Sequence, residues 1–72
     1  MKLQVWQHSI LIAEIHLPHD RPARGPLTDE EQAMVELAST AYHSHGLLET
    51  GYYDVVLTDD TGYEYDSQTL VA

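Results

Sequence analysis

Hydrophobic and polar residues alternate along the first part of the chain, residues 2–17. One parity holds apolar side chains, namely Leu3, Val5, Leu11, Ala13, Ile15 and Leu17. The other parity holds mainly polar ones, namely Lys2, Gln4, His8, Glu14 and His16. A period of two is typical of a strand with one buried face. The pattern fails at Gln7–Ser9, so the segment is either one long strand bulged near His8 or two strands joined by a tight turn. We favour an interruption at Gln7–Ser9.

A loop and then a helix follow this segment. The three prolines and one glycine between Pro18 and Pro26 predict a loop over residues 18–27. Thr28 and Glu31 have the spacing of a capping box, which predicts the start of a helix over residues 29–45, and Gly46 is placed to end it. The apolar residues at helical spacing, which we expect to form its buried face, are Ala33, Met34, Leu37, Ala38, Ala41 and Tyr42.

The last part of the chain, residues 52–71, predicts a hairpin. Residues 52–58 alternate again, with Tyr53, Val55 and Leu57 on one face. Residues 59–62 have turn chemistry, and a return strand follows from residue 63. We expect the apolar face of the helix to pack against the apolar faces of these strands, because each must be buried against another element. The sequence therefore predicts one α+β domain over residues 1–72, an antiparallel sheet of three or four strands with one helix packed on one face.

Charge is distributed very unevenly along this chain. The 72 residues carry a formal net charge of −9, no cysteine, and only three Lys or Arg residues, which are Lys2, Arg21 and Arg24. The acids from residue 25 onward are Asp29, Glu30, Glu31, Glu36, Glu49, Asp54, Asp59, Asp60, Glu64 and Asp66. Such a field repels nucleic acids and anionic membranes and attracts basic partners. With no apolar stretch long enough to span a membrane and no signal-peptide pattern, we expect a cytoplasmic location.

Acids and tyrosines are interleaved in the predicted hairpin. Residues two apart on a strand lie about 6.6 Å apart on one face, so we expect Glu64 and Asp66 to form a row whose spacing resembles that of successive phosphates. Tyrosine is favoured at interfaces. The predicted partner-binding residues are Asp54, Asp59, Asp60, Glu64, Asp66, Tyr63, Tyr65, Asp29, Glu30, Glu31 and Glu36. Whether the acids of the helix start and those of the hairpin share one surface stays open at this point.

In size, charge, lack of cysteine and interleaving of tyrosine with acid over residues 28–66, the chain resembles small acidic phage-encoded inhibitors that mimic DNA, including many anti-CRISPR proteins. These inhibitors share no common motif. The resemblance implies a non-enzymatic inhibitor that binds the basic groove of a nucleic-acid-binding protein such as a CRISPR effector subunit. The oligomeric state, monomer or homodimer, stays open. The alternative is a small acidic protein–protein interaction module, either a homodimeric accessory protein or the partner of a basic toxin.

Other chemistry has weaker support in the sequence. His43 with His45, or His16 with His19 and Asp20, could supply ligands to Zn or Ni, but residues two apart on a helix point in divergent directions. We expect no metal and no cofactor. No nucleophile elbow, P-loop or HExxH motif is present, and so short a chain has little room for a closed cleft. We therefore expect no enzymatic activity.

Two further features of the sequence involve single side chains. Arg21 and Arg24 precede the acidic helix start closely, and we expect them to act as its local counter-charge. Trp6, the only tryptophan, falls on the polar parity of the first strand segment. It is either part of a second small core on that face of the sheet or an exposed binding anchor, and we favour the core.

Overall fold

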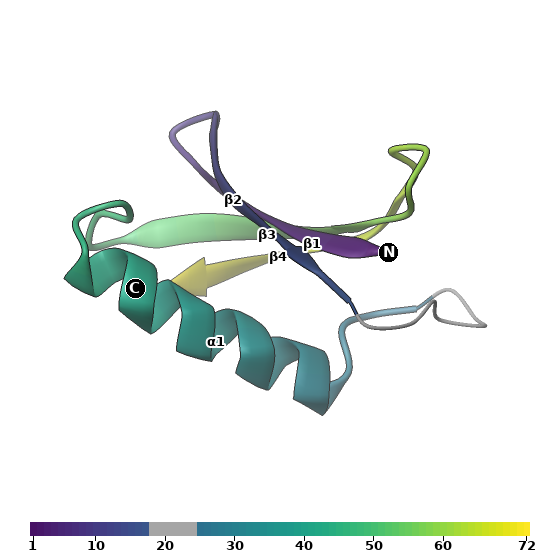
Figure 1. Ribbon diagram of the computed structural model, residues 1–72, viewed down its shortest axis with the longest axis horizontal. Coiled ribbons are helices and arrows are strands. Elements are labelled where there is room, and N and C mark those ends of the chain that lie inside the picture. The colour runs from purple at the N-terminus through teal and green to yellow at the C-terminus, as the bar shows by residue number, and fades with distance from the viewer. Residues whose placement is uncertain (18–24) are drawn as a thin grey trace.

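A four-stranded antiparallel sheet with one helix across one face forms the fold (Figure 1). The computed structural model describes residues 1–17 and 25–72. Its elements in chain order are β1 (Lys2–Gln7), β2 (Ile10–His16), α1 (Asp29–Ser44), β3 (Tyr52–Thr58) and β4 (Glu64–Val71). The strand order is β2-β1-β3-β4, so β2 and β4 are the two edges of the sheet. The α+β class with one helix on one face of the sheet is confirmed.

The first two strands form a hairpin with a two-residue turn. His8 and Ser9 have φ values of 52° and 61°, the left-handed conformation that tight hairpin turns require. The pairing of β1 with β2 shifts between Val5 and Trp6, which leaves Ile12 as an extra residue. This bulge places Leu11 opposite Trp6 and lets Ile12 pack against the core. The simple alternation, which puts Leu11 inside and Ile12 outside, is therefore wrong at these two residues, whereas Ile15 and Leu17 pack against the core as predicted.

The core lies between the centre of the sheet and the helix. Its fully buried members from the two central strands are Leu3, Val5, Val55 and Leu57. Val35 of α1 and Leu48 of the following connection complete it, with Leu27, Tyr53 and Met1 at its margins. At the end of β1 the buried Gln7 side chain bonds to backbone groups of Glu49 and Tyr52 at 2.8–3.1 Å. Each polar atom of this buried amide therefore has a partner.

Both ends of α1 have the predicted chemistry. The Thr28 hydroxyl accepts a hydrogen bond from the Glu31 amide at 3.2 Å, and the Glu31 carboxylate accepts one from the Thr28 amide at 2.9 Å, so the capping box is present. At the other end Gly46 has φ 76°, and the Leu47 amide donates to the Tyr42 carbonyl at 2.9 Å. This arrangement is a Schellman motif, which satisfies the last carbonyl groups of the helix.

The buried face of α1 differs from the predicted one. Glu31, Val35 and Ser39 are buried, and Tyr42 packs against the core, whereas Leu37 is 77% exposed. Of the other predicted core residues, Ala38 is half-buried, and those that are exposed are Ala33, Met34 and Ala41. The apolar arc of the helix is wider than its contact with the sheet, so the sheet covers only one margin of it. No helix in the described ranges is long and apolar enough to cross a membrane.

Candidate functional site

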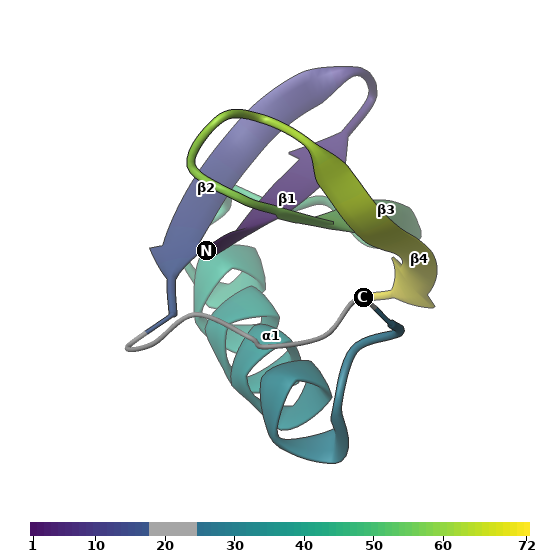
Figure 2. The ribbon, with the colours of Figure 1, turned by 90° about the vertical axis from the view of Figure 1, so that its right-hand side faces the viewer.

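The face of the sheet opposite the helix, called the outer face here, is open to solvent (Figure 2). Alternation along the strands and the pairing register assign its side chains. They are Lys2, Gln4 and Trp6 of β1, Leu11, Glu14 and His16 of β2, Tyr52, Asp54, Val56 and Thr58 of β3, and Glu64, Ser67, Thr69 and Val71 of β4. This surface, built by all four strands, is the candidate binding site.

Trp6 lies near the end of the central strand β1, beside a shallow hollow of about 500 Å³. The hollow is lined by Trp6, Ser9, Asp54, Val56, Glu64 and Ser67. The indole ring is half-buried, and its N–H group donates to the Gln4 side chain at 3.2 Å. Trp6 is therefore neither part of the main core nor an exposed side chain, and the choice between a second small core on the outer face and a binding anchor stays open.

Two exposed carboxylates line the same hollow. Asp54 accepts a hydrogen bond from the Thr69 hydroxyl at 2.7 Å, which fixes its orientation across the β3–β4 pair. Glu64 lies at the start of β4. Within the described ranges the only Lys or Arg is Lys2, which forms an ion pair with Glu14 at 3.0 Å. Neither Asp54 nor Glu64 pairs with that lysine, so their charge is available to a cationic group from outside.

Glu64 and Asp66 do not form the predicted row. Glu64 is opposite Thr58, whereas Asp66 is opposite the buried Leu57, because the register shifts at this point. The two carboxylates therefore lie on opposite faces of the sheet, Glu64 outside and Asp66 on the helix side. Asp66 is half-buried and accepts a hydrogen bond from the Leu27 amide at 3.1 Å, just before the helix. It holds that connection in place, and the prediction of a shared face is wrong.

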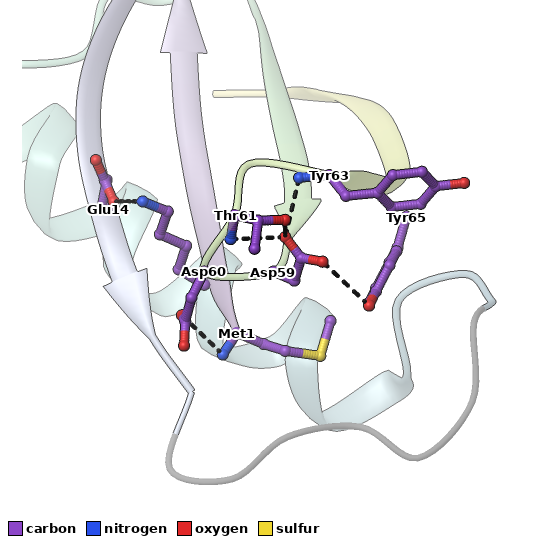
Figure 3. A network of polar contacts seen from close by, with 8 residues as sticks. Met1, Glu14, Asp59, Asp60, Thr61, Tyr63 and Tyr65 are labelled. Carbon is purple, nitrogen blue, oxygen red and sulfur yellow. Dashed lines mark hydrogen bonds and ion pairs between the residues drawn. The ribbon is translucent and has the colours of Figure 1, made fainter.

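Asp59, the first acid of the β3–β4 turn, accepts hydrogen bonds from groups of the same hairpin (Figure 3). One oxygen of Asp59 accepts hydrogen bonds from the Thr61 amide at 2.9 Å, the Thr61 hydroxyl at 2.7 Å and the Tyr63 amide at 2.9 Å. The other oxygen accepts from the Tyr65 hydroxyl at 3.4 Å. These bonds, the Thr61 hydroxyl first and then the Tyr63 amide, lower the pKa of Asp59 below its ordinary value. Asp59 therefore stabilises the turn.

The remaining turn residues have mixed roles. Asp60 is exposed, and its carboxylate lies 3.5 Å from the amino group of Met1. The rings of Tyr63 and Tyr65 meet edge to face with centroids 5.3 Å apart, and Tyr65 also packs against the core. Tyr65 therefore belongs mainly to the fold, whereas Tyr63 is 47% exposed at the margin of the turn.

The acids of the helix start lie on the other side of the sheet from Asp54 and Glu64. Asp29, Glu30 and Glu36 are exposed, and the Gln32 amide group donates to Glu36 at 3.3 Å. Glu31 is buried in the capping box. The helix start and the β3–β4 turn lie at the same end of the molecule, but the sheet separates the helix-start acids from the outer face (Figure 1). The predicted partner-binding acids therefore form two surfaces rather than one.

The sequence offered two sets of possible metal ligands and one expected pair of counter-charges, Arg21 and Arg24. His19, Asp20, Arg21 and Arg24 lie outside the ranges that the structure describes. Across residues 1–17 and 25–72, no group of three or more His, Cys, Asp or Glu side chains is placed to hold a metal ion. The His43 ring lies 2.9 Å from the Thr50 hydroxyl, which is a contact of the helix end with the next connection.

Comparisons with known proteins give no match for this chain. No protein-family model, curated protein or solved structure matches it. A function must therefore be inferred from its own residues.

The outer face combines an aromatic ring, two carboxylates and the hydroxyls of Ser67 and Thr69, a set that suits cations and donors of hydrogen bonds. Sequence reasoning missed Ser67 and Thr69, which carry no charge, and it placed Trp6 on this face, favouring a second small core there over an exposed anchor.

Proposed function

We propose that this chain is a non-enzymatic inhibitor that binds the basic groove of a nucleic-acid-binding protein, such as a CRISPR effector subunit, by mimicking the charge of DNA. The observation that supports this function best is the outer face, where Asp54 and Glu64 flank Trp6 around an open hollow and have no Lys or Arg partner among the described residues. The net charge of −9 supplies long-range attraction to such a groove.

The chemistry of the hollow suits the side chains that contact phosphates. Arg and Lys bind carboxylates by charge-assisted hydrogen bonds and stack on tryptophan by cation–π interaction, which contributes about 0.5–2 kcal/mol. Arg adds a planar fork that can contact a carboxylate and the indole face together. A groove shaped for nucleic acid presents many such cations, and electrostatic complementarity speeds the encounter of the two proteins. Asp54 and Glu64 would occupy positions that phosphates take in the nucleic-acid complex.

The contact surface is smaller than the acid content of the chain suggests. Asp59, Asp66 and Glu31 serve the turn, the connection to the helix and the helix cap. Their charge still adds to the overall field, but these side chains are held by internal hydrogen bonds. We therefore assign direct contacts to the outer face, with Trp6 as its central anchor.

A capture experiment with a matched control tests this function. The chain is immobilised and exposed to nuclease-treated bacterial extract, and bound proteins are eluted with double-stranded DNA and identified by mass spectrometry. We expect nucleic-acid-binding proteins in the DNA eluate. The variant Asp54→Lys/Glu64→Lys should lose them, whereas Asp29→Lys/Glu36→Lys, with the same charge change on the helix side, should retain most of them. Equal losses from both variants, or proteins that DNA does not release, would refute the assignment to the outer face.

The interaction-module alternative also has an observation in its favour. The exposed apolar residues Leu37 and Met34 on α1 provide a surface where binding would depend on hydrophobic contact rather than charge. The two functions differ in their salt dependence, because added salt weakens charge-driven association and leaves apolar association nearly unchanged. An affinity for the captured protein that stays constant from low to high salt would favour the interaction module.

A further inference from the structure

The hollow on the outer face has two chemically different ends. Asp54 is directly opposite Trp6 of β1, and side chains opposite one another in an antiparallel pair have Cβ atoms about 4.5–5.5 Å apart. Glu64 is opposite Thr58, which is four residues further along β3 than Asp54, or about 13 Å at about 3.3 Å per residue. The two carboxylates therefore lie at opposite ends of the hollow, and only Asp54 lies beside the indole.

The shape of the hollow favours a projecting side chain as its occupant. Both hairpin turns, residues 8–9 and 59–63, bend away from the helix and rise above the outer face (Figures 1 and 2). Ser9 of the first turn and Glu64, just after the second, line the hollow, and the paired residues Val56 and Ser67 lie between its ends. A partner therefore reaches the small side chains between the turns with a side chain of its own rather than with a flat surface.

The charged and aromatic groups of the hollow leave acceptors open but no strong donor. The indole N–H of Trp6 already donates to the Gln4 side chain at 3.2 Å. One oxygen of Asp54 accepts the Thr69 hydroxyl at 2.7 Å, and within the described ranges neither its other oxygen nor the Glu64 carboxylate has a hydrogen-bond donor. No Lys or Arg lines the hollow. Such a lining is complementary to a cation that carries hydrogen-bond donors and no acceptor.

We propose that the Trp6–Asp54 end of the hollow binds a single arginine side chain of the partner protein, an inference that rests on the proposed function for the partner itself. A guanidinium group has five donors and no acceptor, and it can stack its face on an indole while its N–H groups contact a carboxylate in plane. The aliphatic part of the arginine packs on Val56. Lysine presents a compact, strongly hydrated charge, which cannot make both contacts at once.

Glu64 has a different role from Asp54 in this arrangement. Its backbone position is about 13 Å from that of Asp54, which exceeds the Debye length of about 8 Å at physiological salt. An arginine stacked on Trp6 therefore gains little from the exposed Glu64 carboxylate. Glu64 remains available for a second cation of the partner, and it provides a matched control within the same hollow.

Titration with blocked amino acids tests the arginine site. The probes are N-acetyl-arginine amide, N-acetyl-lysine amide with the same charge, and N-acetyl-citrulline amide with a similar shape and no charge, all at equal ionic strength. Trp6 is the only tryptophan, so its fluorescence and the NMR signal of its indole N–H report on this end of the hollow. We expect the arginine probe to bind about tenfold more tightly than the lysine probe, and the citrulline probe to bind at least about tenfold more weakly still.

Three variants locate the site, and circular dichroism confirms that each one folds. Asp54→Asn keeps the shape of the side chain and removes its charge, so it should weaken binding of the arginine probe about tenfold or more. Glu64→Gln removes a charge from the far end of the hollow and should weaken binding less than about threefold at 0.15 M salt. Arg21→Gln/Arg24→Gln should bind the probe as the wild type does.

Four results would overturn the inference. They are equal affinities for the arginine and lysine probes, equal effects of Asp54→Asn and Glu64→Gln, an unchanged Trp6 signal at about 0.1 M arginine probe, and tighter binding by Arg21→Gln/Arg24→Gln, which would place an arginine of this chain in the hollow. The capture experiment reports on the proposed function separately. Captured proteins without arginine binding would refute only this inference, whereas arginine binding without captured proteins would refute only the function.

Discussion

Acids on the two faces of the β3–β4 hairpin contrast in their surroundings. On the outer face, Glu64 and Asp54 line an open hollow, and Asp54 is oriented by a single hydroxyl. In the turn and on the helix side, Asp59 accepts bonds from Thr61, Tyr63 and Tyr65, and Asp66 accepts one from the backbone before the helix. The comparison shows that acids within thirteen residues of one hairpin differ in their surroundings: Asp59 and Asp66 are held by internal hydrogen bonds, whereas Asp54 and Glu64 are exposed, and it is these two that we propose contact a partner. Substitutions should therefore separate stability from binding.

The largest effect expected from a single substitution is at Trp6. Trp6→Ala removes the aromatic surface of the hollow while leaving the buried core intact. We expect a loss of about 2 kcal/mol in binding, roughly thirtyfold in affinity for the captured partner. The melting temperature should change much less than the affinity. Titration calorimetry and thermal unfolding measure the two quantities, and Leu47→Ala, at an apolar residue that is 58% exposed in the connection after α1, is the control. A loss of stability without a loss of affinity would place Trp6 in the fold instead.

The helix cap should show the opposite behaviour. Thr28→Ala removes the hydroxyl that accepts the Glu31 amide, and we expect a loss of about 1 kcal/mol in the free energy of unfolding. Thr28→Ser keeps a hydroxyl and should restore most of it. Affinity for the partner should be the same in both variants, since the cap lies on the helix side of the sheet. Urea unfolding gives the stability, and a marked fall in affinity for Thr28→Ala would show that the two faces are not independent.

The internal bonds of Asp59 predict a defined pH dependence. Because they lower its pKa in the folded state, the folded protein favours the charged form. The resulting stability is present above the unfolded-state pKa of about 3.9 and is lost as the pH falls through the lower folded-state pKa. Asp59→Asn should therefore be less stable than the wild type at pH 5–7, and the gap should close below about pH 4. Urea unfolding across this range measures the gap.

A separate variant controls for the loss of one negative charge from a repelling molecule. Glu64→Gln removes the same charge from the exposed end of β4, so subtracting its effect isolates the bonds of Asp59. A gap between the wild type and Asp59→Asn that stayed constant from pH 7 to pH 3 would contradict the assignment of Asp59 to the turn.

The smallest expected effect concerns the whole acidic field. Added NaCl screens repulsion among exposed carboxylates that no Lys or Arg of the described residues offsets, apart from the Lys2–Glu14 pair. We expect the melting temperature to rise by a few degrees, corresponding to about 1 kcal/mol, between low and moderate salt. Differential scanning calorimetry measures the shift. A melting temperature that decreased with NaCl would argue against a repelling surface.

Local chemistry made the elements of this fold predictable. The capping box of Thr28 and Glu31, the glycine at residue 46 and the turn at residues 59–62 each fix a boundary through contacts within a few residues. Which side of each strand and of the helix is buried was less predictable. Bulges near Ile12 and Tyr65 each reverse the parity of one strand, and they depend on pairing with a distant partner. This is why Leu11 lies on the outer face and not inside, and why Asp66 does not share a face with Glu64.

The candidate site was predictable only in part for the same reason. The excess of acids led to the hypothesis of a basic partner, and Asp54 and Glu64 were among the predicted partner-binding residues. The capping box implied the internal bond of Glu31, and the bonds of Asp59 are also local, but the sequence could not show that Asp66 is held by an internal bond, because the tertiary fold brings its partner, the Leu27 amide, to it. The buried side of α1 was also ambiguous, since its apolar arc exceeds the width that one sheet can cover.

Displacement of DNA tests the central claim most directly. Fluorescence anisotropy follows a labelled duplex bound to the captured nucleic-acid-binding protein while the chain is added. We expect the wild type to release the duplex completely, and Asp54→Lys/Glu64→Lys to require at least about a hundredfold more protein, whereas Asp29→Lys/Glu36→Lys should need far less excess. If the duplex stays bound at saturating wild type, or if the outer-face variant releases it as well as the wild type does, the outer face is not a mimic of DNA.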